Sequence, residues 1–420
     1  MRIIKNSRGL SMISVLLIMV FYLSLFVFGV DNVMAEEKIR IGTIFPLSGN
    51  LALNGQDTFA GAQIAQEIIN EQGGINGKQI EFIIADAPDA NAAVQEADRL
   101  ITQEGVDIII GTQSSSLSYA ASAVAERKQK VYWEVEGVAD SITNRGYKYL
   151  FRVTFSARQM SEQMLEFIKN VATEKLGKDE KDLRVALIYE DGEFGTSTTN
   201  NLKDLLKDYE FDFIMEAGYS AKSAELDSLV LKIKNNNPDV LLSISTINDS
   251  ILLANTLKRH NFKPPIIIGT TAGHGTPDFV KGVGKEEADG ILAAGIPNAI
   301  NVEKMKPEIK ELYDELSKKY KAKKDKEISV NVLNGFNGTW VLLKHVLPQV
   351  EEINPENIRE AALNVSIEEG NTILGYGVKF AGPDASNAGH NIRAFAAVMQ
   401  WQNGKLYIVY PDAIALKSAK

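Results

Sequence analysis

The sequence contains no cysteine and only one cluster of basic residues. The absence of cysteine excludes disulfide bonds and thiolate metal sites, so the hydrophobic core alone must hold the fold together. The basic cluster, SKKYKAKKDKE at 317–327, is typical of the solvated end of a helix. Because nucleic-acid binding depends on clustered Lys and Arg, this composition argues against a nucleic-acid partner.

The chain is acidic and long. Its 420 residues include 45 Lys and Arg against 54 Asp and Glu. Residues 1–35 contribute three of the basic residues and one of the acidic ones, so the remainder has 42 against 53, a net charge of −11. The chain is 45% hydrophobic, which is ample for packed cores, and its length lies in the range where one core splits into two domains.

The N-terminal segment differs from the rest. Three basic residues precede an apolar stretch over residues 10–30, and the small residue Ala35 stands in a cleavage position. This pattern predicts a secretory signal peptide over residues 1–35, and therefore a location in the periplasm or at the outer face of the cytoplasmic membrane. The apolar stretch has 21 residues, more than the usual length of about 7 to 15, so an uncleaved membrane anchor stays an alternative. No cysteine lies near the cut, which excludes a lipid anchor there.

From Glu37 onwards, short strand-like runs alternate with helix-like segments, as in βαβ units around a largely parallel sheet. The first series predicts strands over 39–46, 80–86, 106–112 and 130–136. A second series of similar layout begins at 149–154. No Pro/Ser linker separates the two series. We therefore expect an α/β fold with two doubly wound parallel-sheet domains, joined by strands that cross between them.

The last third of the chain is predicted to be mainly helical, with long helices near 303–323 and 328–347. Two final strand-like runs, RAFAAVMQW and KLYIVYP, flank the dipeptide Asn403-Gly404. An Asn-Gly dipeptide between two such runs is a strong signal for a β-hairpin.

The carboxyl ends of the predicted strands are rich in Gly, Ser, Thr and Asn. In open parallel sheets, ligands bind outside these ends. The segments concerned are PLSGNLALNG (46–55), GTQSSS (111–116), EVEGVAD (134–140), EDGEFG (190–195), STIND (245–249) and GTTAGHG (269–275). Together they predict a polar pocket.

Seven segments carry a resemblance to a known family: IGTIFPLSG, AGAQIAQEIINEQGGINGKQIEFIIAD, ADRLITQEGVDIIIGTQSSS, YLFRVT, VALIYEDGEFG, NNPDVLL and IIGTTAGHG. In this order and spacing, they resemble the periplasmic solute-binding proteins of the branched-chain amino acid ABC transporter family, which are leucine/isoleucine/valine-binding-protein-like. The resemblance extends over nearly the whole mature chain. It implies a type I periplasmic binding fold with a ligand held between two domains, closure on binding, and delivery to the permease subunits of an ABC transporter.

Under this resemblance, the chain divides into two lobes. Residues 36–153 and 298–390 are expected to form the N-terminal lobe, and residues 154–297 and 391–420 the C-terminal lobe. We expect a monomer that binds a small-molecule solute.

The segment GTQSSS is the clearest candidate for a ligand contact. The resemblance places a hydroxyl that binds the amino acid carboxylate at Ser115, with Gln113 and Ser116 beside it. Serines at the start of a helix also present hydroxyls and free backbone N–H groups to an anion. Simple helix capping by residues 114–116 is the alternative reading.

Several expected ligand positions depart from the family pattern. Val138 stands where leucine-type members have a threonine hydroxyl, and Thr271 stands where an acidic residue grips the α-ammonium group of the ligand. Glu136 stands at the position where leucine-type members show a backbone carbonyl. Aromatic positions also differ: Asn54 and Thr246 replace tyrosines, while Phe194 keeps a ring without the hydroxyl. Leucine-type specificity therefore does not follow, and aliphatic, aromatic, amide and quaternary-amine ligands stay open.

Two glutamates in one predicted strand need an explanation, because a buried carboxylate without a partner is costly. By period-two alternation, Glu134 and Glu136 share one face of the strand and Trp133 lies on the other. We hypothesise that Glu136, or also Glu134, supplies the negative charge missing at Thr271 and pairs with a cationic group of the solute. The alternative is a structural ion pair with Arg152, Arg127 or Lys130. Trp133 is either a core residue or a platform for an ammonium group.

Two other functional classes can be considered. The same module could present its solute to a chemoreceptor or kinase as a sensor. An exported α/β hydrolase would need Ser115, His274 and Asp140 or Asp191, yet GTQSSS lacks the Gly-x-Ser-x-Gly elbow. Without that elbow, His274 is instead a residue that could line the cleft. Metal-ligand spacing is absent from the remaining histidines, His260, His345 and His390. We therefore expect a binding protein, not an enzyme, and no cofactor.

Overall fold

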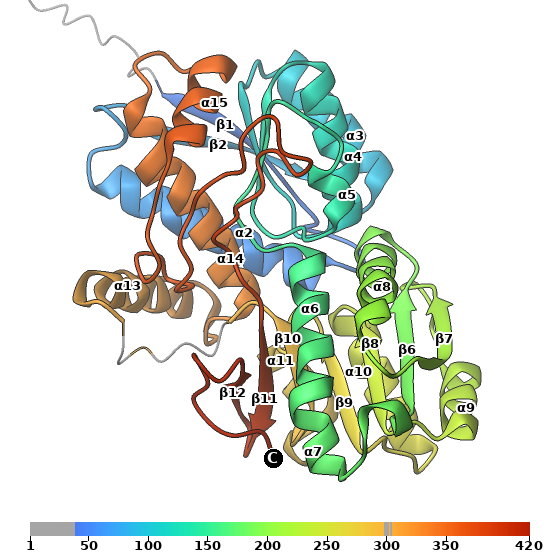
Figure 1. Ribbon diagram of the computed structural model, residues 1–420. Helices are drawn as coiled ribbons and strands as arrows, with labels where there is room; N and C mark the ends of the chain where they lie inside the picture. Colours follow the sequence, from blue (N-terminus) through green and yellow to red (C-terminus); the bar gives the residue numbers. More distant parts are fainter. Residues whose placement is uncertain (1–37, 298–301, 303–304) are drawn as a thin grey trace, which may run out of the picture.

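The computed structural model describes residues 38–297, 302 and 305–420, so the expected signal peptide lies outside the described residues. Two lobes are visible in Figure 1, each built around its own β-sheet. Within the described ranges, no helix is long and apolar enough to cross a membrane.

The N-terminal lobe contains a five-stranded sheet in the order β2-β1-β3-β4-β5, in which every pair is parallel. Its strands are β1 (Ile39–Phe45), β2 (Ile80–Asp86), β3 (Ile108–Gly111), β4 (Val131–Glu134) and β5 (Leu150–Arg152). Buried side chains of α3 (Ala90–Thr102), α4 (Ser115–Arg127) and α5 (Asp140–Thr143) cover one face. The other face is covered by α2 (Ala52–Glu71), a π-helical segment (Val341–Val346) and α15 (Pro355–Asn364). The sheet is thus buried on both faces, as its apolar strands require.

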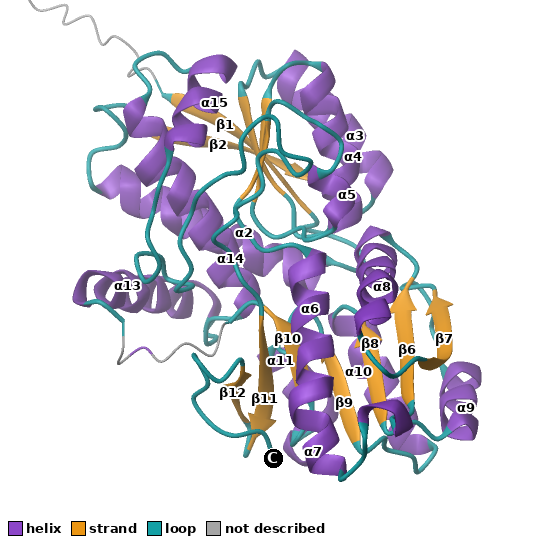
Figure 2. Cartoon of the chain, viewed as in Figure 1, coloured by secondary structure: helices purple, strands orange, loops and turns teal. Residues whose placement is uncertain are grey.

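The C-terminal lobe contains a seven-stranded sheet in the order β12-β11-β10-β9-β8-β6-β7 (Figure 2). Its strands are β6 (Val185–Glu190), β7 (Phe213–Tyr219), β8 (Val240–Ile244), β9 (Ile266–Thr270), β10 (Leu292–Gly295), β11 (Ala397–Gln402) and β12 (Lys405–Tyr410). One face packs against α6 (Ala157–Phe167) and α8 (Glu193–Leu205). The other packs against α9 (Asp227–Asn236), α10 (Ile247–Arg259) and α11 (Pro277–Val283).

The predicted fold class is confirmed, and the predicted hairpin is present. Asn403 and Gly404 connect β11 and β12 with φ values of 54° and 77°, which are the left-handed conformations that a two-residue turn needs. This hairpin adds two antiparallel strands to the parallel strands β6 to β10, so the second sheet is mixed. The expected strand over 130–136 ends earlier, at Glu134.

Two helices that lie far apart in sequence meet at glycines. Helix α2 packs against α14 (Val330–Trp340), which continues into the π-helical segment. A Cβ atom added at Gly61 would lie 2.1 Å from the carbonyl oxygen of Val332, and one added at Gly335 would lie 1.8 Å from that of Thr58. The two helices therefore touch backbone to backbone, which brings the start of α14 beside the carboxyl ends of the strands. A third helix, α13 (Pro307–Lys324), borders α2.

Crossing segments join the lobes. The chain leaves β5 and enters α6 after four residues, while residues 389–391 run alongside β5 before the chain reaches β11. Arg152 marks this point, since its N–H donates to Gly389 and its carbonyl accepts from Asn391. The sheet memberships fit the expected division into lobes, whose boundaries stay a prediction.

Candidate ligand-binding site

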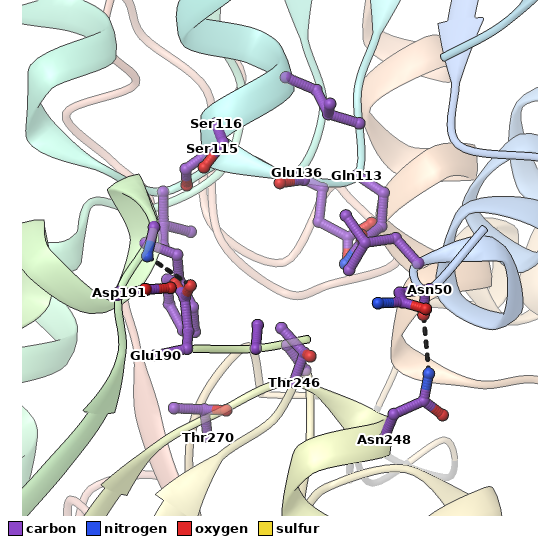
Figure 3. Close-up of a pocket in the computed structure, with 18 of the residues that line it drawn as sticks. Asn50, Gln113, Ser115, Ser116, Glu136, Glu190, Asp191, Thr246, Asn248 and Thr270 are labelled. Carbon is purple, nitrogen blue, oxygen red and sulfur yellow. Dashed lines mark hydrogen bonds between the residues drawn. The ribbon is translucent and has the colours of Figure 1, made fainter. Parts of the chain in front are cut away.

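A cavity of about 280 Å³ lies between the two lobes. Figure 3 shows polar side chains of both lobes directed toward this space, with Ser115, Ser116, Gln113 and Glu136 from the N-terminal lobe and Glu190, Asp191, Thr246, Thr270 and Asn248 from the C-terminal lobe. Apolar side chains complete the wall: Leu51, Val138, Phe155, Met160, Phe194, Ile296 and Val330. The cavity therefore suits a small molecule with an apolar body and polar ends.

Helix α4 begins at the cavity wall with Ser115. The Ser115 hydroxyl oxygen accepts a hydrogen bond from the Ala139 N–H at 3.1 Å, and the Ser116 hydroxyl accepts one from the Glu193 N–H of the other lobe, also at 3.1 Å. Ser114 occupies the N-cap position but makes no capping hydrogen bond with its side chain. The serine hydroxyls are therefore engaged around the cavity instead of capping their own helix. The first-turn N–H groups of any helix lack intrahelical partners and attract anions.

Glu136 faces the cavity and is nearly buried, with 7% of its surface exposed. Its carboxylate accepts a hydrogen bond of 2.6 Å from the Thr58 hydroxyl. Burial raises the pKa of this carboxyl well above its usual value, an effect that the Thr58 hydrogen bond partly offsets. The described residues form no ion pair with it, since Arg152 binds backbone carbonyls and Lys130 pairs with Asp107. This carboxyl therefore faces the cavity without a cationic partner among the described residues, and a cation bound there would favour its charged form.

Two amide side chains near Glu136 have buried atoms without hydrogen-bond partners. The Gln113 side-chain oxygen, at the cavity wall, has none among the described residues. The Asn334 amide is close enough to Glu136 to lower the pKa of that carboxyl, but both of its polar atoms lie outside hydrogen-bond geometry. Unsatisfied buried polar atoms are rare, and three of those in the described residues belong to these two amides.

Glu134 lies behind the cavity wall and does not line it. Its carboxylate accepts hydrogen bonds from the backbone N–H groups of Glu136 and Gly137, at 2.8 and 2.5 Å, and from that of Thr112 at 3.4 Å. Burial raises the pKa of Glu134 to about 7, although these hydrogen bonds and one with Ser118 lower it. Glu134 thus connects the loop before α4 with the loop after β4 through hydrogen bonds.

The expectation that Glu134 and Glu136 share one face was wrong. Period-two alternation holds only within a strand, and β4 ends at Glu134. Beyond this residue the chain bends, so Glu134 points toward α4 while Glu136 points toward Thr58 of α2. The expected structural ion pairs are also absent from the described residues, because backbone N–H groups and a hydroxyl take the place of cationic partners.

Two further expected contacts lie away from the cavity lining. Trp133 is fully buried, packs against Phe151 and Phe380, and donates its indole N–H to the Gly338 carbonyl at 2.8 Å. It is a core residue. Asn54 donates to the Ala272 carbonyl at 3.0 Å, which is a hydrogen bond between the two lobes.

The C-terminal lobe contributes two acidic residues, Glu190 and Asp191. Glu190 was not singled out from the sequence, and Asp191 was considered only for a hydrolase. The segment EDGEFG signals both residues, since Glu190 ends β6 and Asp191 follows it. The Glu190 carboxylate accepts from the N–H groups of Gly192 and Gly195, at 2.7 and 2.6 Å, so it holds the start of α8. Burial raises the pKa of this carboxyl.

The remaining expected residues of this lobe, Phe194, Thr246 and Thr271, line the cavity. The Thr246 hydroxyl donates to Asp249 at 2.6 Å, and the Thr271 hydroxyl accepts from the Ile296 N–H at 3.3 Å. His274 was considered for the cleft but is buried away from it, and burial lowers its pKa to about 3. In the described part of the chain, no group of three or more acidic or histidine side chains could hold a metal ion.

Comparisons with known proteins find relatives over most of the chain. A family model described as periplasmic binding protein matches residues 38–405. Among curated proteins, "Leu/Ile/Val-binding protein homolog 7" of Brucella suis biovar 1 (strain 1330) is 35% identical over 387 residues, covering 92% of this chain and 94% of its own length. "Leu/Ile/Val-binding protein homolog 8" of Brucella abortus (strain 2308) is 33% identical over 383 residues, covering 91% and 93%.

Solved structures share the fold. The branched-chain amino acid transporter substrate binding protein LivJ from Streptococcus pneumoniae, in complex with isoleucine, superposes with a TM-score of 0.74 at 20% identity, covering 88% of this chain and 98% of its own. A solute binding protein of an ABC transporter from Rhodopseudomonas palustris BisB5, in complex with 3,4-dihydroxy benzoic acid, has a TM-score of 0.72 at 17% identity, covering 88% and 95%. One architecture thus accommodates chemically different ligands.

Proposed function

The chain belongs to the periplasmic binding protein family, and from this premise we propose that it is the extracytoplasmic solute-binding component of an ABC importer. In this proposal it binds an amino acid, or a related small solute that carries an amine, between its lobes. It then hands the solute to the permease subunits, and it catalyses no reaction.

One observation carries the choice of solute: the cavity places an anion-binding helix start and an unpaired buried carboxylate on the same lobe. Ser115 and Ser116 stand at the start of α4, and Glu136 faces the same space from the loop after β4 (Figure 3). A zwitterion supplies both charges. A charge-assisted hydrogen bond is roughly twice as strong as a neutral one, so an ammonium group on Glu136 would add affinity.

The proposed roles follow from position. Ser115 and Ser116 donate to the solute carboxylate, while Glu136 and the unpartnered oxygen of Gln113 accept from its ammonium group. The apolar body of the solute lies against the apolar wall residues Val138 and Phe194, with Thr246 and Thr271 contacting it from the C-terminal lobe.

Hydrogen bonds between the lobes support a mechanism of closure around the solute. Asn54 donates to Ala272, and Asn248 donates to the Asn50 carbonyl at 2.7 Å. Because the cavity wall comes from both lobes, a solute gains its full set of contacts only when the lobes are together. Binding therefore favours the closed state by this difference in contacts.

A thermal-shift screen against amino acids, their amides, polyamines, betaines and aromatic acids tests the proposal. A ligand that binds only the folded protein raises its melting temperature by mass action. We expect hits that carry a cationic nitrogen, and we expect Glu136→Gln to lose them. Glu351→Gln, a change of the same kind at an exposed position, is the matched control and should keep them. Hits confined to uncharged or purely anionic solutes would contradict the amine requirement.

A further inference from the structure

Arg152, the last residue of β5, is a buried charge without a carboxylate partner. None of its surface is exposed. Its guanidinium donates to the carbonyl oxygens of Val138 and Ala139 at 2.9 and 2.7 Å, to the Thr143 hydroxyl at 3.1 Å, and to the His390 ring at 3.1 Å. All of these acceptors of the guanidinium are neutral. Asp140 and Glu134 lie near enough to raise the pKa of Arg152, but neither forms an ion pair with it in the described part of the chain. A buried charge is normally retained only with a counterion, so this one needs a reason.

The charge persists at neutral pH. Burial lowers the pKa of Arg152, but only to about 10. The His390 ring cannot share the charge, because its Nδ1 accepts from Arg152 and because burial and the adjacent guanidinium hold its pKa well below the ordinary value. Arg152 is therefore a fixed cation at the junction of the lobes.

A chain of hydrogen bonds leads from this cation to the cavity. Arg152 donates to the Val138 carbonyl, and the same peptide group donates its N–H, that of Ala139, to the Ser115 hydroxyl oxygen at 3.1 Å. The Val138 carbonyl also accepts at 2.7 Å from the N–H of Ala157, at the start of α6 in the other lobe. Two donors thus polarise one peptide group, and hydrogen bonds in such a chain strengthen one another.

This series of hydrogen bonds decides whether the Ser115 hydroxyl donates or accepts at the cavity. A hydroxyl has one hydrogen to donate. Since the Ser115 oxygen already accepts from Ala139, and since this side chain lines the cavity, the hydroxyl hydrogen is left to donate to a solute. The positive charge of Arg152, at the other end of this series of hydrogen bonds, makes an anionic acceptor the preferred one.

We propose that Arg152 is a specificity-determining residue, which acts through the Val138–Ala139 peptide on Ser115 and makes the cavity select a carboxylate over the corresponding uncharged amide. The inference rests on the proposed function, because it assumes a solute carboxylate at Ser115. Arg152 touches no solute in this scheme. It is a positioning and polarising residue, and its contribution is a preference between two ligands rather than a contact with either.

The test compares affinities for matched probes by isothermal titration calorimetry. The probes are L-leucine, L-phenylalanine and L-lysine, each with its carboxamide, at about pH 6, where the α-ammonium group of acid and amide alike is protonated. The measured quantity is the ratio of the two dissociation constants in each pair. We expect Arg152→Gln to reduce the preference for the carboxylate by about tenfold, because the fixed positive charge that favours an anion at Ser115 is removed.

Arg145→Gln is the matched control, because Arg145 also donates to backbone carbonyls of the same lobe, those of Ile142 and Tyr119, but away from the cavity. It should leave the ratio unchanged. If Arg152 were merely structural, Arg152→Gln would weaken both members of each pair equally, and that result would overturn the inference. If no carboxylate binds the wild type better than its amide, the proposed carboxylate site fails, and the inference fails with it.

Arg152→Gln could unfold the protein, so a measurement on the wild type accompanies it. Because the hydrogen bonds are coupled, the amide proton of Ala139 should shift downfield in the NMR spectrum when a carboxylate probe binds, and less when its carboxamide binds. Equal shifts with both probes would refute the proposed coupling through these hydrogen bonds. Arg152→Lys, which keeps the charge within a similar volume, should preserve most of the ratio.

Discussion

Replacing Glu134 with glutamine should remove a pH-dependent loss of stability. Burial raises the pKa of this carboxyl to about 7 in the folded protein, from an ordinary value of 4.5. The folded state therefore binds the proton more tightly than the unfolded chain. The contribution of Glu134 to stability is fully present below about pH 4.5 and is lost as the pH rises toward 7.

The expected magnitude follows from the two pKa values. The gap between 4.5 and about 7 corresponds to about 3 kcal/mol at about 1.4 kcal/mol for each pKa unit. Burial also raises the pKa of Glu136 and Glu190, so the whole protein loses more than this over the same range. The difference between wild type and variant isolates Glu134. Glutamine keeps a side-chain oxygen that can accept from the N–H groups of Glu136 and Gly137.

The assay is urea unfolding followed by circular dichroism at about pH 4 and about pH 8. We expect the free energy of unfolding to fall between these pH values by about 3 kcal/mol less in Glu134→Gln than in the wild type. Glu351→Gln, at an exposed position, should behave as the wild type. An identical pH dependence in Glu134→Gln and wild type would refute the reasoning, since it would mean that Glu134 does not titrate in this range.

Three other changes have definite expected outcomes. Gly335→Ala would place a methyl group 1.8 Å from the carbonyl oxygen of Thr58 and should lower the free energy of unfolding by about 1 to 3 kcal/mol in a denaturant titration. Gly382→Ala, where nothing lies within 4 Å of the added Cβ atom, should be nearly neutral. Equal effects of the two changes would contradict the helix contact. Asn54→Ala removes a hydrogen bond between the lobes and should weaken solute binding about fivefold in calorimetry. The radius of gyration in X-ray scattering should increase. Unchanged values would show that this hydrogen bond does not favour closure. Gly404→Ala puts a side chain at a φ of 77° and should destabilise the protein by about 1 kcal/mol, seen as a lower melting temperature; an unchanged melting temperature would mean that the turn relaxes.

Local patterns were sufficient for the architecture but not for the site. The hairpin at Asn403 and Gly404 was predictable because two adjacent residues carry the signal, and so was the helix start at Ser115. The two glutamates show the limit. Alternation assigned Glu134 and Glu136 to one face, yet the strand ends at Glu134, and the end of a strand depends on its neighbours in the sheet as well as on its own residues. Glu190 was missed because one acidic residue at the end of a strand does not reveal that it faces a cavity.

The α/β class and the two-part layout were predictable from the sequence, because hydrophobic periodicity and turn residues act within a few positions of the chain. So were the loops that gather at the carboxyl ends of the strands. Only the tertiary structure decided which polar residues share the cavity, because that depends on contacts between distant segments. Thr58 of α2 meets Glu136 at a separation of 78 residues, and Arg152 meets His390 at a separation of 238. No local pattern encodes such a meeting, since it follows from how whole helices and sheets pack.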